Sequence, residues 1–193
     1  MGDAQYSAAI EIRPAVPKDA DGIARTFLES AEYHAELDSE RYLIPALETT
    51  TALYREGRQH PPQADEEAIT HVAELSGEIV GFLDARLERS PDAMHRAIIY
   101  CHIAEFAVRR EHWNQGIGGR LLCTAEEWGR RMGAEFASLE YLAANVRASL
   151  FYQGRMGYHP ASITSIKRLS CGDASAEHSD SRLSPGSLSV RSE

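Results

Sequence analysis

The sequence has little lysine and no long apolar run. Lys18 and Lys167 are its only lysines, and 29 acidic side chains against 20 basic ones give a net charge of −9. A protein that binds the phosphate backbone of nucleic acids needs clustered positive charge, so we expect no nucleic-acid partner. No segment approaches the run of about 20 apolar residues that spans a membrane, and the first residues lack a signal-peptide core. We therefore expect a cytoplasmic protein with no membrane partner.

Cysteine is also scarce. Cys101, Cys123 and Cys171 are odd in number and far apart in the sequence, which fits neither a disulfide framework nor a zinc site. We therefore expect no bound metal. Neither Cys101 nor Cys123 has an activating group nearby, so we expect both to be buried as small apolar side chains and not to carry acyl groups.

The remaining composition is that of one soluble domain. The chain has 193 residues, of which 43% are hydrophobic and 25% charged. We expect a folded domain over residues 10–170, preceded by a flexible segment over residues 1–9. Residues 171–193 are rich in serine and have no aromatic side chain and no periodicity, so we expect a disordered tail.

Apolar periodicity and turn residues divide the expected domain into strands and helices. The predicted strands cover residues 10–13, 69–75, 79–87, 97–108 and 136–143, with a weak last strand within 158–170. Gly77 marks a hairpin between the second and third strands. The predicted helices cover residues 19–37, 45–57, 118–133 and 145–156, with Asp19 and Asn145 as N-caps of the first and the last.

The stretch WNQGIG, residues 113–118, lies where the fourth predicted strand gives way to a helix. A Gly-x-Gly pair is common in turns. Between a strand and a helix, however, Gly116 and Gly118 leave free N–H groups at the positive end of a helix dipole, where a pyrophosphate binds well. Arg109, Arg110 and Arg120 are close in the sequence. Neither the P-loop nor the dinucleotide pattern fits, because the required Gly-Lys-Ser/Thr and third glycine are missing.

Two segments resemble motifs of the GNAT acetyltransferase superfamily. VRREHWNQGIGGRLL, residues 108–122, is similar to its acetyl-CoA motif, in which a Gln or Arg is followed by any two residues, a Gly, any residue, and then Gly or Ala. Trp113 occupies the Gln or Arg position. LEYLAANVRASLFYQGRMGY, residues 139–158, resembles a later motif of the same family. The residues that match this later motif are Asn145, Ala148, Tyr152, Gly157 and Tyr158.

The resemblance extends over about residues 10–169 and implies an α/β fold. The implied architecture is a GNAT-like mixed central sheet, splayed between the fourth and fifth strands, with helices on both faces. It also implies acetyl-CoA as the cofactor, with the pantetheine arm lying along the fourth strand like an added strand. The residues implied to bind acetyl-CoA are Phe106, Ala107, Val108, Trp113, Asn114, Gln115, Gly116, Ile117, Gly118, Gly119, Arg120, Asn145 and Tyr152.

Acetyl transfer to an amine needs a neutral amine, a stabilised oxyanion and a proton for the departing thiolate. Glu105 and Glu140 lie in predicted apolar strands and are candidates for the base. Either could instead satisfy backbone N–H groups or pair with an arginine. Glu140 is preferred because its spacing from Asn145 resembles that in family members with a glutamate base, and His102 is a third choice.

The resemblance implies that Tyr152 lies near the cofactor sulfur and acts as the general acid. In the family, the oxyanion meets a main-chain N–H near Ala107 or Val108, where the fourth strand carries a bulge. The alternative for Tyr152, judged from the sequence alone, is a packing role in an amphipathic turn.

The stretch from Glu29 to Glu48 carries six carboxylates with Tyr33, His34 and Tyr42 between them. The resemblance places this region beside the acceptor. An acidic wall with aromatic rings suits a small cationic amine of the polyamine, aminosugar or aminoglycoside class, so Glu32, Tyr33 and Glu36 are predicted to bind substrate. The alternative for these charges is a solvated helix face.

Two other functions stay open. The acceptor could be a protein N-terminus or lysine, or the chain could be an acetyl-CoA-binding sensor without turnover. The sequence also allows a homodimer.

Overall fold

The computed structural model describes residues 9–57, 67–90, 94 and 96–169. The chain separates into two units, Met1–His159 and Pro160–Glu193. Every helix and strand of the described residues lies in the first unit. The tail expected over residues 171–193 and nearly all of the segment expected to be flexible, residues 1–8, lie outside the described residues.

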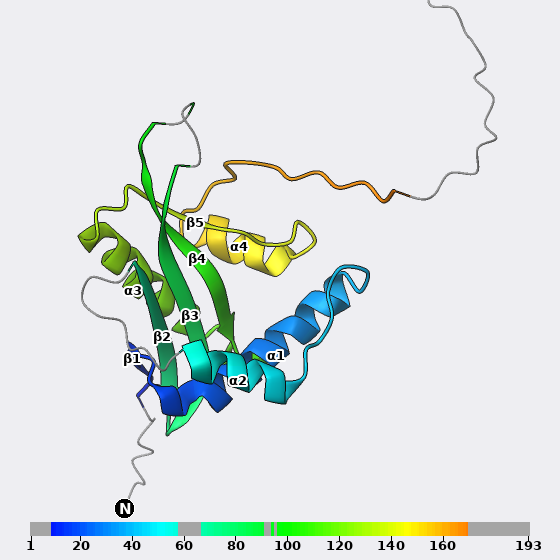
Figure 1. Cartoon of the computed structure of the whole chain (residues 1–193), viewed down its shortest axis with the longest axis vertical. Helices are drawn as coiled ribbons and strands as arrows, with labels where there is room; N and C mark the ends of the chain where they lie inside the picture. Colours follow the sequence, from blue (N-terminus) through cyan, green and yellow to red (C-terminus); the bar gives the residue numbers. More distant parts are fainter. Residues whose placement is uncertain (1–8, 58–66, 91–93, 95, 170–193) are drawn as a thin grey trace, which may run out of the picture. The chain divides into compact units, whose positions relative to one another are not determined.

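One five-stranded sheet forms the centre of the first unit (Figure 1). The strands are β1 (Glu11–Pro14), β2 (Ala68–Leu75), β3 (Glu78–Arg89), β4 (Ile99–Val108) and β5 (Phe136–Leu139), and they lie in this order in the sheet. The pairs from β1 to β4 are antiparallel, and β4 and β5 are parallel. Ser76 and Gly77 make the predicted tight turn between β2 and β3, both with positive φ. The sheet is therefore mixed, as predicted.

The sheet opens between β4 and β5. These strands pair only from Tyr100 with Phe136 to Ile103 with Leu139, where β5 ends, whereas β4 continues to Val108. The predicted strand over residues 136–143 was therefore too long, because residues 140–143 have no strand beside them to accept their hydrogen bonds. Opposite β3, Asp84 pairs with Glu105 and Ala85 with Ile103, so Ala104 is an extra residue and forms a bulge in β4.

Helices cover both faces of the sheet (Figure 1). The helices are α1 (Ala20–Leu37), α2 (Leu47–Gly57), α3 (Ile117–Arg131) and α4 (Val146–Gly154), and the 3-10 turns are η1 (Pro17–Asp19) and η2 (Arg110–His112). Successive strand residues point to opposite faces. Accordingly, Val72 and Phe82 pack in the cluster that contains residues of α1 and α2, whereas Ala73 and Leu83 pack in the cluster that contains residues of α3.

The two predicted helix caps have different outcomes. Asn145 caps α4 as predicted, since its Oδ1 accepts a hydrogen bond of 2.9 Å from the Ala148 N–H. Asp19 precedes α1 but does not cap it with its side chain. Its carboxylate accepts a hydrogen bond from the Val16 N–H and pairs with Arg13 at 2.6 Å, so it joins the first strand to the first helix.

The predicted last strand is wrong, because residues 158–169 form no strand. An alternating pattern gives a strand only where a neighbouring strand accepts its hydrogen bonds.

Cys101 is buried as predicted, and burial raises the pKa of its thiol to about 11. Cys123 is exposed on α3, so the prediction that it is buried is wrong. Within the described residues, no helix has both the length and the apolar composition needed to span a bilayer. No group of three or more metal-binding side chains occurs in this part of the chain either.

Candidate active site

A cavity of about 850 Å³ lies against the open edge of β4. Its walls come from α1, the connector between α1 and α2, the loop between β4 and α3, the residues after β5, and α4. Most of the predicted site residues line it. These are Tyr33, Glu105, Phe106, Ala107, Val108, Trp113, Asn114, Gly116, Ile117, Gly118, Gly119, Glu140, Asn145 and Tyr152. Four predicted site residues do not line it: Glu32, Glu36, Gln115 and Arg120.

The loop before α3 presents unused donors to this cavity. Gly116 is the N-cap residue of α3 and has a φ of 81°, a left-handed conformation that glycine adopts without strain. The main-chain N–H groups of residues 116–119 donate no hydrogen bond to the described part of the protein. Free N–H groups at the positive end of a helix dipole bind anions well, so this loop fits a pyrophosphate.

Gly118 has a second role in this loop. A Cβ atom on Gly118 would lie 3.0 Å from Phe106 Cζ and 3.3 Å from Phe151 Cζ. The rings of Phe106 and Phe151 are stacked, with centroids 6.1 Å apart, and they join β4 to α4. A larger residue at position 118 would therefore push these rings apart, in addition to any effect on a phosphate.

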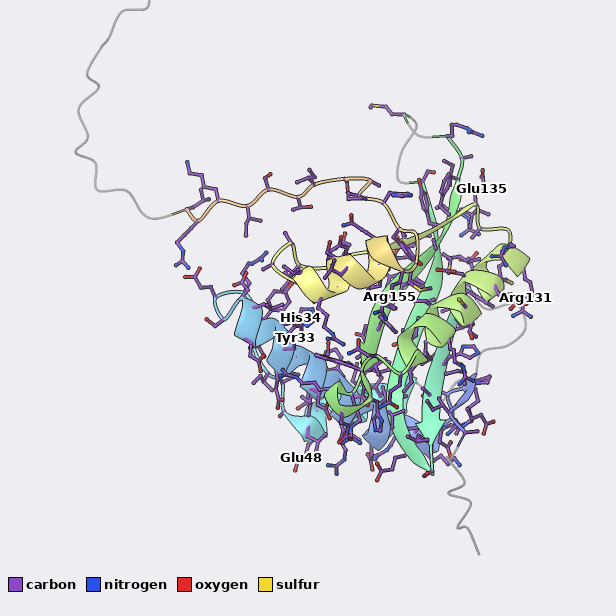
Figure 2. The ribbon with its side chains drawn as sticks, turned by 180° about the vertical axis from the view of Figure 1, so that it is seen from behind. Tyr33, His34, Glu48, Arg131, Glu135 and Arg155 are labelled. Carbon is purple, nitrogen blue, oxygen red and sulfur yellow. The ribbon has the colours of Figure 1, made fainter. Side chains whose placement is uncertain are left out.

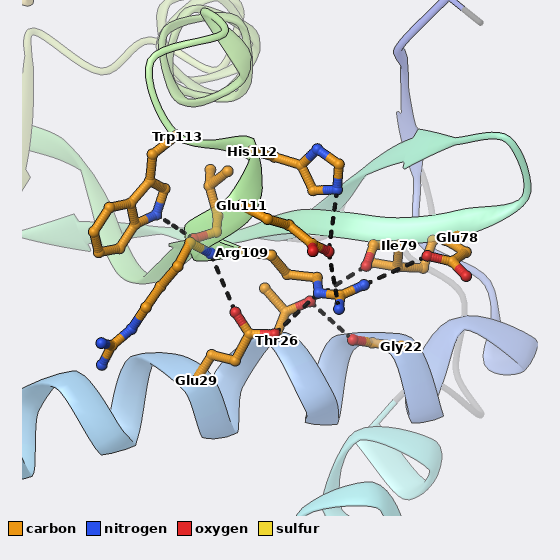
Figure 3. A network of polar contacts seen from close by, with 11 residues as sticks. Gly22, Thr26, Glu29, Glu78, Ile79, Arg109, Glu111, His112 and Trp113 are labelled. Carbon is orange, nitrogen blue, oxygen red and sulfur yellow. Dashed lines mark hydrogen bonds and ion pairs between the residues drawn. The ribbon is translucent and has the colours of Figure 1, made fainter.

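The arginines close to the loop in sequence do not line the cavity. Arg109 pairs with Glu29 of α1 at 3.0 Å, and also with Glu78 and Glu111 (Figure 3). Arg110 pairs with Glu36 at 2.8 Å. Arg120 donates a hydrogen bond to the carbonyl of Ile10, and the side chain of Gln115 donates one to the carbonyl of Glu111.

A different arginine lies at the loop. Arg147, in the first turn of α4, lines the cavity, and its guanidinium lies 3.9 Å from the centroid of the Trp113 ring. It also donates a hydrogen bond of 3.3 Å to Asn114 Oδ1. No sequence pattern pointed to Arg147. Its place two residues after the cap Asn145, at the start of a helix, was the only available signal.

The open edge of β4 has free main-chain groups. The Arg109 N–H donates to the Val80 carbonyl, and pairing in an antiparallel ladder alternates, so Ala107 directs its main-chain groups toward β3. Phe106 and Val108 therefore direct theirs toward the cavity. Trp113 Nε1 already donates to the Val108 carbonyl at 2.6 Å. An extended arm could bind along this edge as an added strand does.

Tyr152 is buried among aromatic rings where α4 faces β4. The rings within 6.3 Å of its own, measured between centroids, are those of Phe106, Tyr141, Phe151 and Tyr158. Burial, and to a smaller extent the nearby Tyr141, raise the pKa of Tyr152 above its ordinary value, so the phenol stays protonated at neutral pH. A phenol with a raised pKa is a weaker acid than a thiol, whose ordinary pKa is about 8.5. Tyr152 is therefore suited to donate a hydrogen bond to a departing sulfur and is poorly suited to protonate a free thiolate.

The two predicted base candidates differ in environment. Glu140 directly follows β5 and is exposed, although a buried strand position was expected. Glu105 is partly buried on β4 and accepts a hydrogen bond from the hydroxyl of the buried Tyr54 of α2. The ring of Tyr54 contacts those of Phe27 and Phe82, with centroids 6.0 and 5.7 Å away. Glu105 is therefore held in place, whereas His102 bonds to Ser138 and does not line the cavity.

The acidic wall predicted on α1 is largely neutralised. Glu29 and Glu36 bond to Arg109 and Arg110, and Glu32 is exposed outside the cavity lining. Tyr33 and His34 of α1 line the cavity, as does Arg155, which follows α4 (Figure 2). On the α1 side, the cavity is therefore aromatic more than acidic.

Known proteins share this architecture. The model of the acetyltransferase (GNAT) family matches residues 22–158. No curated protein matches the sequence. A mutant of the BH1408 protein from Bacillus halodurans has a similar structure, with a TM-score of 0.73 at 18% identity over 82% of this chain and 99% of that chain.

Two further solved structures are similar. AAC(6')-Iy, in complex with a bisubstrate analogue that contains CoA, has a TM-score of 0.58 at 15% identity over 85% of this chain and 100% of that chain. The ribosomal-protein-alanine N-acetyltransferase from Brucella melitensis biovar Abortus 2308 has a TM-score of 0.57 at 15% identity, over 84% of this chain and 100% of that chain. At such identities the likeness supports the fold, and the family model covers most of the sequence. The chain belongs to the GNAT family of acetyltransferases.

Proposed function

We propose that the chain transfers the acetyl group of acetyl-CoA to the primary amine of a small cationic acceptor. The observation that carries the proposal is that one cavity brings together the free N–H groups of residues 116–119, the carboxylate of Glu105 and the phenol of Tyr152. The N–H groups suit the phosphates of an anionic acetyl donor, the carboxylate suits an amine that must lose a proton, and the phenol suits a sulfur that must leave.

Acetyl-CoA supplies the acetyl group as a thioester. The groups that would hold it are the N–H groups of residues 116–119 for the pyrophosphate, and the main-chain groups of Phe106 with the N–H of Val108 for the pantetheine arm. The similarity to AAC(6')-Iy, whose structure contains a CoA analogue, supports this choice of donor. The cavity has room for such an arm beside an acceptor.

Glu105 would take one proton from the acceptor ammonium, because only the neutral amine has a lone pair for attack. A C–N bond then forms at the acetyl carbon, and the C–S bond breaks with its electron pair on sulfur. The second proton of the nitrogen passes to the thiolate, and Glu105 releases the first proton to solvent, so ammonium and thioester give amide, thiol and one free proton. Tyr152 would donate a hydrogen bond to the sulfur as it leaves, and the N–H of Phe106 or Val108 is available to the carbonyl oxygen.

The acceptor is proposed to carry an ammonium group. The carboxylates of Glu105 and Glu140 line the cavity, and negative charge in a cavity favours a cationic ligand. The pairing of Glu29 and Glu36 with arginines favours an acceptor with one ammonium over a polycation such as an aminoglycoside. The similar structures include acetyltransferases of both aminoglycosides and a ribosomal protein, so a protein N-terminus is the second candidate acceptor.

The test is thiol release from acetyl-CoA, followed with a chromogenic reagent across a panel of amines, peptides and antibiotics. We expect at least one amine to accelerate release and to gain a mass of one acetyl group. Calorimetric binding of acetyl-CoA without amine-stimulated release would instead indicate a sensor module. The homodimer and the cytoplasmic location stay predictions.

A further inference from the structure

The α1 side of the cavity ends in exposed apolar side chains. Leu43 is 76% exposed and Tyr42 is 38% exposed, yet both line the cavity from the connector between α1 and α2. Single exposed apolar residues are ordinary, but these lie together at one cavity. Their apolar surface is available to whatever occupies the cavity, and its removal from water would favour binding.

The same wall continues inward as rings. Phe27 and His34 of α1 line the cavity, and the rings of His34 and Tyr42 lie 5.3 Å apart. Phe27 contacts Tyr54, whose hydroxyl bonds to Glu105. An aromatic and apolar wall therefore leads from the exposed Leu43 toward the carboxylate proposed to deprotonate the acceptor.

The charges in the cavity do not favour a polycation. The lining contains two carboxylates, Glu105 and Glu140, and two arginines, Arg147 and Arg155. The acidic residues of α1 that could have attracted further ammonium groups bond to arginines or lie outside the lining. An acceptor with one ammonium group at Glu105 is therefore complementary in charge to this cavity.

On the basis of the proposed function, we infer that the acceptor is a monoamine whose amino group is attached to an apolar body, either aromatic or branched aliphatic. The ammonium meets Glu105, and the apolar body lies against Phe27, Tyr42 and Leu43. Burial of each methylene of such a body contributes about 0.8 kcal/mol, which is roughly a fourfold gain in affinity, so the wall discriminates against polar amines of equal charge.

The experiment compares phenylethylamine, ethanolamine and spermidine as acceptors, using kcat/KM from thiol release. We expect phenylethylamine to exceed both other amines by about tenfold or more. Leu43→Ser should lower kcat/KM for phenylethylamine by about fourfold to tenfold and leave that for ethanolamine nearly unchanged. Because Leu43 is exposed, this substitution should not impair folding.

The matched control is Ile44→Ser. Ile44 is adjacent to Leu43 and 54% exposed, but it does not line the cavity. Its replacement should therefore change kcat/KM for neither phenylethylamine nor ethanolamine. Three outcomes would overturn the inference while acetylation itself persists. The wild type could prefer spermidine or a peptide N-terminus, or Leu43→Ser could lower kcat/KM equally for all acceptors. The third outcome is a change of oligomeric state in Leu43→Ser. If no amine accelerates thiol release although acetyl-CoA binds, the proposed function fails and the inference fails with it.

Discussion

At the scale of single residues, the environments of the two candidate bases decide which of them is favoured. Sequence spacing favoured Glu140, but that residue is exposed after the end of β5. Glu105 is partly buried and held by Tyr54, which fixes the position of the carboxylate. A base that is fixed in place needs little reorganisation to accept a proton from a bound amine. We therefore assign the role of base to Glu105 in the proposed reaction.

Replacement of Glu105 tests this role. Glu105→Gln should lower kcat/KM at neutral pH by about 10²- to 10³-fold, because the amine is then deprotonated only by solvent. The deficit should shrink as the pH rises toward the pKa of an alkylamine, about 10.4, where the neutral amine forms without help. The pH profile of thiol release measures this effect. Glu140→Gln is the control, and its kcat/KM should fall much less. If Glu140→Gln instead shows the larger fall in kcat/KM, the role of base belongs to Glu140.

Replacement of Tyr152 tests the proposed donor to sulfur. Tyr152→Phe should lower kcat by about 10²- to 10³-fold, because one hydrogen-bond donor to the developing charge is lost. The affinity for acetyl-CoA should stay nearly unchanged, since the ring still packs. Burial raises the pKa of Tyr152, so the wild-type kcat should not fall through ionisation of this phenol below about pH 10. Tyr158→Phe removes a hydroxyl that bonds to Glu126 outside the cavity lining, and serves as the control. Full activity in Tyr152→Phe would contradict the assignment.

At the scale of secondary-structure elements, two helices hold the loop before α3. Arg109 and Arg110 join this loop to α1 through Glu29 and Glu36, as Figure 3 shows for Arg109. Arg147 joins it to α4 through its contact with Trp113. The wall beside the acceptor and the anion-binding loop are thus parts of one connected arrangement.

Arg147 should contribute to the binding of the coenzyme phosphates. Because a hydrogen bond to a charged group contributes about 1.5–3 kcal/mol, Arg147→Gln should weaken the calorimetric affinity for coenzyme A by about tenfold or more. The affinity for pantetheine, which has no pyrophosphate, should change little. Arg110→Gln removes the same charge from a side chain that pairs with Glu36 outside the cavity, and should have a smaller effect. Equal losses in the two variants would indicate a general effect of positive charge.

At the scale of the whole first unit, a partly buried histidine is costly to protonate. His71 lies on β2, and its buried Nδ1 has no hydrogen-bond partner among the described residues. Burial, with a smaller effect from Arg131, lowers the pKa of His71 below its ordinary value of about 6.5. The unfolded chain therefore binds this proton more readily than the folded chain does.

Stability should accordingly fall in mild acid. The contribution of His71 to the free energy of unfolding is complete above about pH 6.5, and it is lost as the pH falls from there toward the lowered pKa of the folded state. Thermal unfolding followed by circular dichroism between pH 7 and pH 5 should show a decline in Tm that is smaller in His71→Gln. The exposed His159 provides the control variant His159→Gln, whose decline should match the wild type. Identical declines in all three proteins would contradict the prediction.

A second acid transition should appear at lower pH. Burial alone would raise the pKa of Asp19, but the hydrogen bonds from Arg13 and from the Val16 N–H outweigh it and hold the pKa below the ordinary value. The stability due to Asp19 is therefore present above about pH 3.9 and is lost as the pH falls through the folded pKa. This window lies below that of His71, so the two contributions are separable.

The sequence alone determined the features that depend on residues close together in the chain. The turn at Gly77, the cap Asn145 and the loop around Gly116 follow from local backbone preferences, and a family resemblance carried by two short motifs predicted the mixed sheet. The tertiary structure decided which charged groups meet. Arg109 pairs with Glu29, 80 residues away, and Tyr54 with Glu105, 51 residues away. Such pairs depend on the packing of distant elements, which no local pattern encodes, and for this reason the acidic wall of α1 and the choice between Glu105 and Glu140 could be judged only from the fold.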